Sequence, residues 1–234
     1  FGKRLLDHTL SWLKGNGITE VYLAAQQDPG SFQKYSAQLS APEWKVTCFR
    51  GGDLAELAHL ADCIGDEPLL LVDGPVLCDF WLDGVAEFHR SHGGQATMVL
   101  YRHPAPLDYD LVLTGQDGRV RQIIQRPGWS QVVSSTVATG IFLLEPKALA
   151  LAAEEECVPG LDLILRLLQA QAGVYACVPK GYWADIRDGI SYLNCVEDCL
   201  NGRCHLDMGL PERKRGVWSE APLPEGVQLI PPCW

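Results

Sequence analysis

A cluster of soft metal ligands lies near the end of the chain. It consists of Cys195, Cys199, Cys204 and His205. The spacing, Cys-x3-Cys-x4-Cys-His, puts the first two thiols on one helix face, and thiolates and imidazoles are ligands that zinc prefers. Because this spacing matches no standard zinc framework, thiols packed under the last helix are the favoured interpretation and a zinc site is the alternative.

Two histidines, His89 and His92, lie three residues apart near the end of an expected helix. Imidazoles in this arrangement can bind a metal, or they can interact with the negative end of the helix dipole. The dipole interaction is the favoured interpretation.

The elements that must position such residues alternate between strands and helices. Apolar residues at helical spacing predict helices, and short apolar or alternating runs predict strands. The expected helices are 5–13, 31–39, 54–64, 82–92, 161–170 and 190–200, and the expected strands are 18–25, 44–49, 68–72, 95–102, 111–114, 120–125, 137–144 and 174–178. This order predicts an α/β, Rossmann-like fold with a mainly parallel sheet and helices on both faces. The Gln116-Asp117-Gly118 turn adds a small antiparallel hairpin patch.

Composition narrows the classes of function. The 234 residues are 47% hydrophobic and 21% charged, and 19 basic against 29 acidic residues give a net charge of -10. An acidic chain is not expected to bind nucleic acid, although a few local arginines suffice for an anionic small molecule. No apolar run reaches the ~18–20 residues of a membrane span. Nine cysteines without a disulfide framework predict free thiols and a cytoplasmic location.

Eight stretches follow one another in a recognisable order. The most specific is Gly181-Tyr182-Trp183-Ala184-Asp185-Ile186. The others are 2–8, 17–21, 76–80, 87–89, 117–120, 126–128 and 139–142. In order and spacing they resemble the sugar-1-phosphate nucleotidyltransferases, the family that includes the mannose-1-phosphate guanylyltransferases. The resemblance covers residues 1–202, where we therefore expect a nucleotidyltransferase-like domain.

The resemblance implies a reaction and its partners. In this family an oxygen of a sugar-1-phosphate attacks the α-phosphorus of a nucleoside triphosphate, pyrophosphate leaves, and a nucleotide sugar forms. Such a transfer needs positioning and charge neutralisation more than a covalent nucleophile. The implied partners are a nucleoside triphosphate or nucleotide sugar, a sugar-1-phosphate and magnesium. A homo-oligomer is compatible with the family, whereas nucleic acid and membranes are not expected partners.

The resemblance also implies segments outside this domain. The family places a Gly-rich loop, Gly-x-Gly-Thr-Arg, at the end of a first, central strand, and we expect that strand and loop to lie upstream of Phe1. Residues 203–234 begin as a charged linker and continue as a tail rich in proline and glycine. This tail resembles the start of the left-handed β-helix that often follows the domain in this family.

The resemblance assigns candidate roles position by position. The candidate magnesium ligands are Asp185 and Asp73, the candidate catalytic contact to phosphate is Arg126, and the candidate substrate-binding residues are Gly74, Tyr109, Asp110, Thr139 and Gly140. Ligands in open α/β sheets bind at the carboxyl ends of the strands. We therefore expect a pocket at this edge of the sheet, bordered by Gly74, Arg126, Gly140 and Asp185.

Each charged candidate also has a purely structural interpretation. Asp185 can cap the helix that starts near Asp188, and Arg126 can be a solvated hairpin residue. Asp73 can be a turn residue whose side chain bonds its own backbone. The sequence leaves these alternatives open.

Several positions depart from the family pattern. Pro75 stands where the metal-binding turn has an acidic residue, and proline cannot coordinate magnesium. Asp110 replaces a glycine, and its carboxylate would repel a phosphorylated sugar. Gln125 replaces the acid of a Glu-Lys-Pro segment, and Arg187 replaces the glycine that follows Trp-x-Asp-Ile. The loop expected against the base reads Gly51-Gly52-Asp53-Leu54-Ala55 in place of Leu-Gly-Thr-Ala-Gly.

These departures predict a nucleotidyltransferase-family domain that is weakly active or inactive. If it is active, the expected reaction is sugar-1-phosphate nucleotidyl transfer. The alternative is a non-catalytic domain on the same fold that binds a sugar nucleotide or serves regulation or assembly. The sequence selects neither the base nor the sugar.

Overall fold

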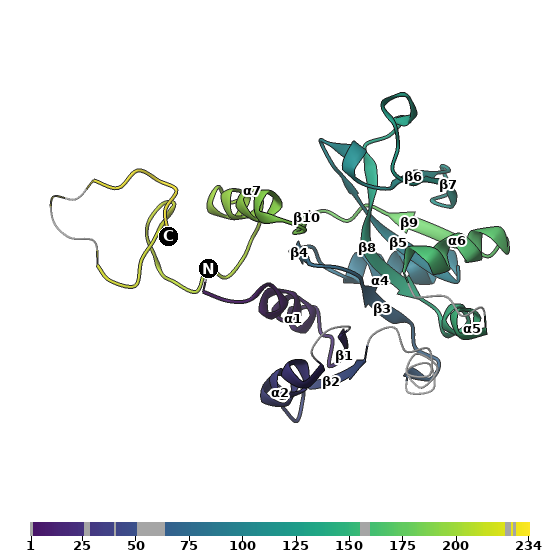
Figure 1. The fold of residues 1–234 in the computed structure, drawn as a ribbon, viewed down its shortest axis with the longest axis horizontal. Coiled ribbons are helices and arrows are strands. Elements are labelled where there is room, and N and C mark those ends of the chain that lie inside the picture. Colours follow the sequence, from purple (N-terminus) through teal and green to yellow (C-terminus); the bar gives the residue numbers. More distant parts are fainter. Residues whose placement is uncertain are drawn as a thin grey trace. The chain divides into compact units, whose positions relative to one another are not determined.

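The computed structural model describes residues 2–25, 29–39, 41–50, 64–154, 160–222, 226 and 228–234 (Figure 1). The chain divides into two compact units. The first, here the terminal unit, comprises Phe1–Leu13, Gly74–Trp81 and Lys180–Trp234. The second, here the sheet unit, comprises Lys14–Asp73 and Leu82–Pro179. Each unit is thus assembled from segments that are distant in the sequence.

The sheet unit contains most of the regular structure. Its strands are β1 (Glu20–Ala25), β2 (Lys45–Arg50), β3 (Leu69–Val72), β5 (Ala96–Arg102), β6 (Leu111–Thr114), β7 (Val120–Ile124), β8 (Thr136–Leu144) and β9 (Val174–Cys177). Its helices are α2 (Pro29–Leu39), α4 (Asp83–His92), α5 (Pro146–Glu154) and α6 (Leu161–Gln169), with the 3-10 turns η1 (Pro106–Asp108) and η2 (Trp129–Gln131). The terminal unit holds β4 (Val76–Cys78), β10 (Trp183–Asp185), α7 (Gly189–Leu200), β11 (Glu212–Lys214), β12 (Val217–Trp218) and most of α1 (Leu5–Gly15).

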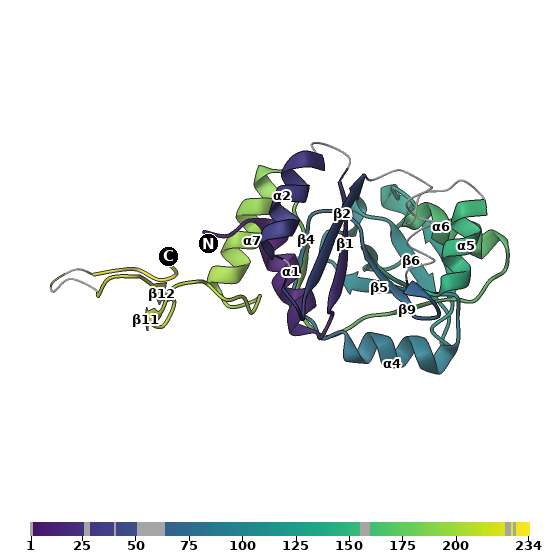
Figure 2. The same cartoon turned by 90° about the horizontal axis from the view of Figure 1, so that it is seen from below.

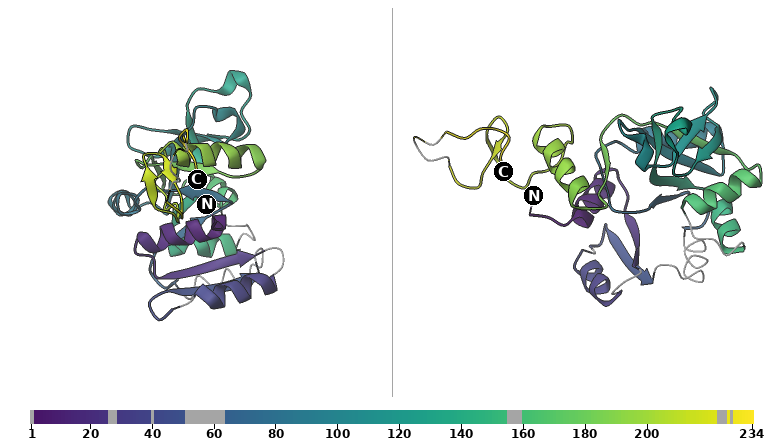
Figure 3. Two further views of the ribbon diagram at one scale, coloured as in Figure 1. Left: turned by 90° about the vertical axis from the view of Figure 1, so that its left-hand side faces the viewer. Right: turned by 45° about the horizontal axis from the view of Figure 1, so that its top comes forward.

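The main sheet is mixed. Six strands of the described chain form it in the order β7-β6-β8-β5-β9, with β3 also paired to β8. β8 runs antiparallel to β3, β5 and β6, whereas β9 runs parallel to β5. β3 and β5 therefore point the same way on either side of β8 (Figure 1). The separate β1–β2 pair is parallel, and α2 packs along it (Figure 3).

β8 changes partners at a bulge formed by Thr139 and Gly140. The register of the β5–β8 ladder shifts between Val99 and Leu100 of β5. Thr139 and Gly140 of β8 therefore have no counterpart on β5. On the amino-terminal side of the bulge β8 pairs with β6, and on the carboxyl-terminal side it pairs with β3. The bulge is therefore the point at which β8 changes its partner on this side from β6 to β3.

Alternate residues of β5 face two different layers of helix. Ala96, Met98 and Leu100 belong to the buried cluster that also contains residues of α5 and α6. Thr97 lies between them in sequence and contacts His89 of α4. Because successive side chains of a strand point to opposite faces, α4 covers one face of the sheet and α5 with α6 covers the other (Figure 2).

His89 is fully buried under α4. Its Nδ1 lies 2.8 Å from Thr97 Oγ1, and its Nε2 lies 2.9 Å from Glu145 Oε1. The dipole interaction expected for His89 is therefore wrong, because the ring points inward to two polar partners. His92 does lie at the helix end as expected, with Nδ1 2.8 Å from the Phe88 carbonyl oxygen in the last turn.

The structure confirms the α/β class, the Rossmann-like architecture, the helices on both faces and the antiparallel hairpin. The sheet is mixed rather than mainly parallel because β8 lies between β3 and β5. The strands β4 and β10 are three residues long, too short to give a periodic signal in the sequence. The helix expected over 54–64 and the loop at 51–55 lie outside the described residues, except for Ile64.

The tail is described over 203–222, 226 and 228–234. Within it β11 and β12 form an antiparallel pair, and a β-helix start is not confirmed. The division of the sequence at residue 202 stays a prediction. None of the helices in the described ranges combines the length and apolar character that a bilayer crossing requires.

Candidate functional site

A short ladder in the terminal unit brings Asp185 beside the turn that follows β3. β10 pairs antiparallel with β4, and Asp185 is opposite Val76. The amide of Ile186 donates to the Pro75 carbonyl oxygen at 2.9 Å. Gly74, whose φ is 94°, lies two residues from the partner of Asp185. The structure therefore brings Gly74 and Asp185 together, as the resemblance predicts.

The ladder is fastened by a buried carboxylate, Asp79, at the end of β4. Its Oδ1 accepts from the Tyr182 amide at 2.6 Å, and its Oδ2 accepts from the His205 amide at 2.8 Å. A Cβ atom at Gly181 would lie 2.8 Å from Asp79 Oδ1 and 2.7 Å from Phe80 Cβ, so the close approach requires glycine. Asp79 therefore positions the Gly-Tyr-Trp segment that leads into Asp185.

The cysteine cluster belongs to the core of the terminal unit. Cys195, Cys199 and Cys204 are buried together with Leu77 and Tyr182. A hydrogen bond with Cys199 raises the pKa of Cys195, and burial adds to the effect. No group of three or more His, Cys, Asp or Glu side chains in the described part of the chain could hold a metal ion. The core interpretation of the thiols is confirmed.

His205, the fourth member of that cluster, turns to a different partner. Its Nδ1 lies 3.2 Å from Asp79 Oδ2, while most of the ring is exposed to solvent. The zinc alternative therefore has no support in the structure.

Asp185 is paired with Arg187, the residue that replaces the family's glycine. Arg187 Nε donates to Asp185 Oδ2. The Asp185 side chain is only 12% exposed, whereas that of Arg187 is 53% exposed. A carboxylate removed from water needs a counter-charge, and here the counter-charge is a guanidinium, which stays charged at all physiological pH values. Asp185 is therefore not a helix cap, and its role as a magnesium ligand stays a prediction.

The segment after Asp185 is held by the start of α7. The cap of α7 is Asp188, which accepts from the Ser191 amide at 2.7 Å. This bond lowers the pKa of Asp188. The Ser191 hydroxyl in turn accepts from the Arg187 amide at 3.0 Å. The capping role considered for Asp185 is therefore filled by Asp188, and the same network fixes the backbone of Arg187.

In the sheet unit, Asp73 lies against two glycines. Its amide donates to the Gly140 carbonyl oxygen at 2.7 Å, and a Cβ atom at Gly160 would lie 3.2 Å from its Oδ2. Gly160 precedes α6, and a negative charge there is stabilised by the helix dipole. Asp73 therefore has a structural position at the start of α6, and its role as a magnesium ligand stays a prediction.

Thr139 and Gly140 are occupied by the bulge in β8. The buried Thr139 hydroxyl donates to the Val99 carbonyl oxygen at 2.6 Å and accepts from the Ile141 amide at 3.2 Å. Gly140 has a φ of 78°, and a Cβ atom there would lie 2.5 Å from the Asp73 carbonyl oxygen. Both residues are needed for the shape of the strand, and substrate contacts by them stay a prediction.

Asp110 and Arg126 are connected in the hairpin region. The Arg126 amide donates to Asp110 Oδ1 at 3.1 Å, and the Asp110 carbonyl oxygen accepts from Ala138 at 2.9 Å. Arg126 has a φ of 46°, a left-handed conformation that is costly for a residue with a Cβ atom. The Asp110 carboxylate thus supports a strained turn, a role that its sequence position does not reveal. Tyr109 packs against His103, with 4.6 Å between ring centroids.

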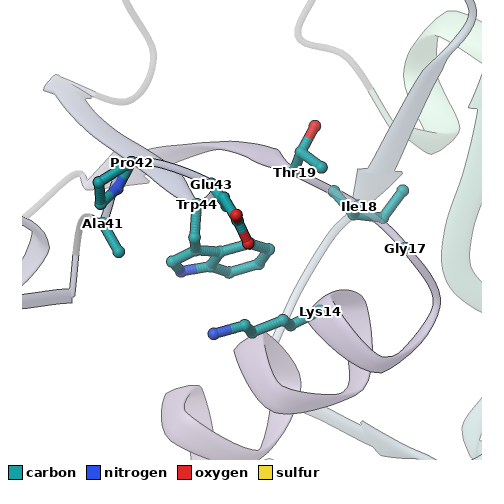
Figure 4. Close-up of a pocket in the computed structure, with 8 residues that line it drawn as sticks. All are labelled: Lys14, Gly17, Ile18, Thr19, Ala41, Pro42, Glu43 and Trp44. Carbon is teal, nitrogen blue, oxygen red and sulfur yellow. The ribbon is translucent and has the colours of Figure 1, made fainter.

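A separate hollow lies at the amino-terminal ends of β1 and β2. It has a volume of about 390 Å³, and its lining residues are Lys14, Gly17, Ile18, Thr19, Ala41, Pro42, Glu43 and Trp44. The Lys14 ammonium lies over the Trp44 ring, 5.9 Å from its centroid (Figure 4). None of the candidate site residues lines this hollow, which is at the opposite ends of its strands from the expected pocket.

Comparisons with known proteins agree on one family. The family model described as Nucleotidyl transferase matches residues 1–202. Mannose-1-phosphate guanylyltransferase 1 of Arabidopsis thaliana is 29% identical over 216 residues, which cover 85% of this chain and 57% of that protein. The catalytic subunit beta of the same enzyme from Drosophila pseudoobscura pseudoobscura is 25% identical, covering 98% of this chain and 61% of its own length. The chain thus spans about three-fifths of the curated relatives it matches.

The fold has solved counterparts as well. The UTP-bound UGPase from Acinetobacter baumannii superposes with a TM-score of 0.70, covers 88% of this chain and 85% of its own, and is 18% identical. A putative glucose-1-phosphate thymidylyltransferase from Bacillus anthracis gives a TM-score of 0.64 at 17% identity, covering 87% of this chain and 84% of its own. At these identities the likeness concerns the fold.

The bulge predicts that Gly140 tolerates no side chain. In Gly140→Ala the new Cβ meets a backbone oxygen that cannot move aside. We expect the free energy of unfolding to fall by about 1–3 kcal/mol beyond the cost of the left-handed backbone. Gly17→Ala is the matched control, because Gly17 has a φ of 79° and nothing within 4 Å of a Cβ atom. Urea denaturation compares the two variants, and equal losses would show that the close approach to Asp73 does not matter.

The left-handed backbone of Arg126 predicts a trade between stability and binding. Arg126→Gly relieves the strain, and we expect it to raise the free energy of unfolding by about 1 kcal/mol or less, since glycine is freer in the unfolded chain. If Arg126 contacts phosphate, the same variant weakens nucleotide binding. Urea denaturation and calorimetric titration with UTP measure the two effects. Unchanged UTP affinity would contradict the phosphate contact.

Proposed function

Because the chain belongs to the nucleotidyl transferase family, we propose that it binds a nucleoside triphosphate or nucleotide sugar, and a sugar-1-phosphate, but joins them slowly or not at all. The reaction it is related to is attack of a sugar-1-phosphate oxygen on the α-phosphorus, with loss of pyrophosphate. The neutralisation of charge on the reacting phosphates is the part of this chemistry that the chain's residues alter most.

The observation that carries the proposal is the ion pair of Asp185 with Arg187. Magnesium binds through one or two carboxylates in a nearly octahedral shell of oxygens. The residues at the family's two ligand positions do not fit it. Asp185 already has a guanidinium on its carboxylate, and Pro75 has no side-chain oxygen, while its carbonyl oxygen accepts from Ile186. Loss of the cation would cost transition-state stabilisation, and each 1.4 kcal/mol or so is about tenfold in rate.

Other residues support binding rather than chemistry. Arg126 keeps a cation in the segment where the family has Lys before Pro. The exposed side chain of Arg126 starts from a backbone that Asp110 holds in a strained conformation, and such strain often accompanies ligand sites. A guanidinium matches phosphate oxygens in geometry and charge. This arrangement supports an anion-binding role for Arg126, with Asp110 as its positioning residue.

A second candidate is an active transferase. It is favoured by the relatives, since proteins named mannose-1-phosphate guanylyltransferase match 85% to 98% of this chain at 24% to 29% identity. Under this alternative Asp185 would exchange its partner Arg187 for a metal during the reaction. Turnover assays separate the two candidates.

The setting of the protein is also a proposal. The described cysteines, among them the buried Cys78 and Cys195, are free thiols, which supports a reducing compartment such as the cytoplasm. Assembly into a homo-oligomer is compatible with the family. Sedimentation of the purified chain measures its oligomeric state.

The proposal predicts a stepwise recovery of metal-dependent binding. The double variant Pro75→Asp/Arg187→Gly restores an acid in the turn and frees Asp185. We expect magnesium to increase its thermal stabilisation by UTP or GTP, because a ligand that binds only the folded state stabilises it. The unmodified chain and the control Pro75→Ala should show no such dependence on magnesium.

Turnover is measured by pyrophosphate release with several triphosphates and sugar-1-phosphates. We expect little or none from the unmodified chain. Robust magnesium-dependent release that Asp185→Ala abolishes would show that the chain is an active enzyme, and the proposal would be wrong.

A further inference from the structure

We infer that Arg187 replaces the divalent cation of this site, so that the chain binds nucleotide phosphates without a metal. The inference rests on the proposed function, because it concerns the same nucleotide. It starts from the disagreement between the magnesium that the family implies and the residues that are present at Asp185 and Pro75.

The negative charge of Asp185 needs a positive partner. Its side chain is mostly buried, and in β10 its position is fixed by pairing with Val76. A buried carboxylate without a counter-charge is strongly unfavourable. The Arg187 guanidinium occupies Asp185 Oδ2, and its positive charge repels a divalent cation that approaches the other oxygen. It therefore competes with any divalent cation for the same carboxylate.

Arg187 is fixed in position and remains accessible to solvent. Its amide donates to the Ser191 hydroxyl at 3.0 Å, and its side chain returns to Asp185. Arg187 is thus held through both its backbone amide and its guanidinium, which fixes the position of the positive charge. About half of the side chain remains exposed to solvent. A phosphate can reach a group with this exposure, whereas it could not reach a fully buried pair.

The start of α7 is another possible source of positive potential at this point of the chain. The first turn of a helix offers amide donors to anions, and α7 begins at Gly189, two residues after Arg187. Here the Ser191 amide already donates to the Asp188 carboxylate at 2.7 Å, which places a negative charge at the helix start. The side chain that brings positive charge to this segment is therefore Arg187.

A guanidinium and a magnesium ion contact phosphate oxygens in different ways. It offers planar hydrogen-bond donors and a single permanent charge, which suit phosphate oxygens. It does not gather several phosphate oxygens in one octahedral shell, as magnesium does. Such a site holds a nucleotide well and neutralises a transferring phosphate less completely. Tight binding with weak transfer is the expected combination.

The test is calorimetric titration of the full chain with UTP and with GTP, each in magnesium and in excess EDTA. We expect the dissociation constant to change by less than about threefold between the two conditions. Arg187→Gly should weaken binding in EDTA about tenfold or more, and magnesium should restore part of it. The matched control is Arg203→Gly, because Arg203 is a more exposed arginine of the same unit that pairs with Asp198. It should leave affinity unchanged in both conditions.

The outcomes separate the two proposals. Binding of either nucleotide only in magnesium would overturn the role of Arg187 and the magnesium independence expected of the unmodified chain, whereas nucleotide binding with slow transfer would still stand. No binding in either condition would overturn both. Equal losses of affinity in Arg187→Gly and Arg203→Gly would also overturn the role of Arg187, because the loss would then reflect net charge alone.

A second measurement does not depend on nucleotide. Electron paramagnetic resonance with Mn²⁺ alone should detect no tight binding to the unmodified chain, and it should detect stronger binding in the double variant Pro75→Asp/Arg187→Gly, through the freed Asp185 and the restored acid. If Arg187→Gly does not fold, the paired variant Asp185→Asn/Arg187→Met removes both charges and should lose binding of UTP and GTP in EDTA. Tight Mn²⁺ binding to the unmodified chain that Asp185→Asn abolishes would contradict the inference.

Discussion

The close approach of two backbones at Gly140 is the constraint on which the main sheet depends. Here β8 leaves β6, skips two positions opposite β5 and joins β3, and the Asp73 amide bonds to the Gly140 carbonyl oxygen at 2.7 Å. Only glycine permits this approach, because a Cβ atom would lie 2.5 Å from a carbonyl oxygen. The hydroxyl of Thr139 donates to the carbonyl oxygen of Val99, where the β5–β8 register shifts. The bulge thus sets the end of β3 and the start of the turn at Gly74.

In the terminal unit a buried carboxylate, rather than a glycine, holds distant segments of the chain together. The buried carboxylate of Asp79 accepts from amides of two distant segments, those of Tyr182 and His205. This bonding fixes the short β10 strand on β4 and so fixes Asp185. Arg187 then supplies the charge that Asp185 requires. Under the proposed function these two departures from the family pattern act on one site, because Pro75 would remove one acid and Arg187 would neutralise the other.

Part of this could be predicted from the sequence. The string through Trp183 and Asp185 identified Asp185 as a candidate, because its residue types and order are specific to the family, but the strand β10 that holds it was not predicted. Periodicity predicted most strands but not their neighbours, and the position of β8 between β3 and β5 depends on a bulge with no periodic signal. The role of Asp79 could not be predicted, since its partners lie 103 and 126 residues away. The departure at Arg187 is visible in the sequence, but its bond to Asp185 depends on the direction of a side chain.

The central claim is that a guanidinium and not a metal neutralises Asp185 when nucleotide is bound. The most direct measurement is an anomalous difference map from crystals of the full chain grown with UTP and Mn²⁺. We predict bound UTP, the Arg187 guanidinium still on the Asp185 carboxylate, and no manganese peak within coordination distance of its oxygens. A manganese peak on Asp185 with Arg187 displaced into solvent would contradict the claim.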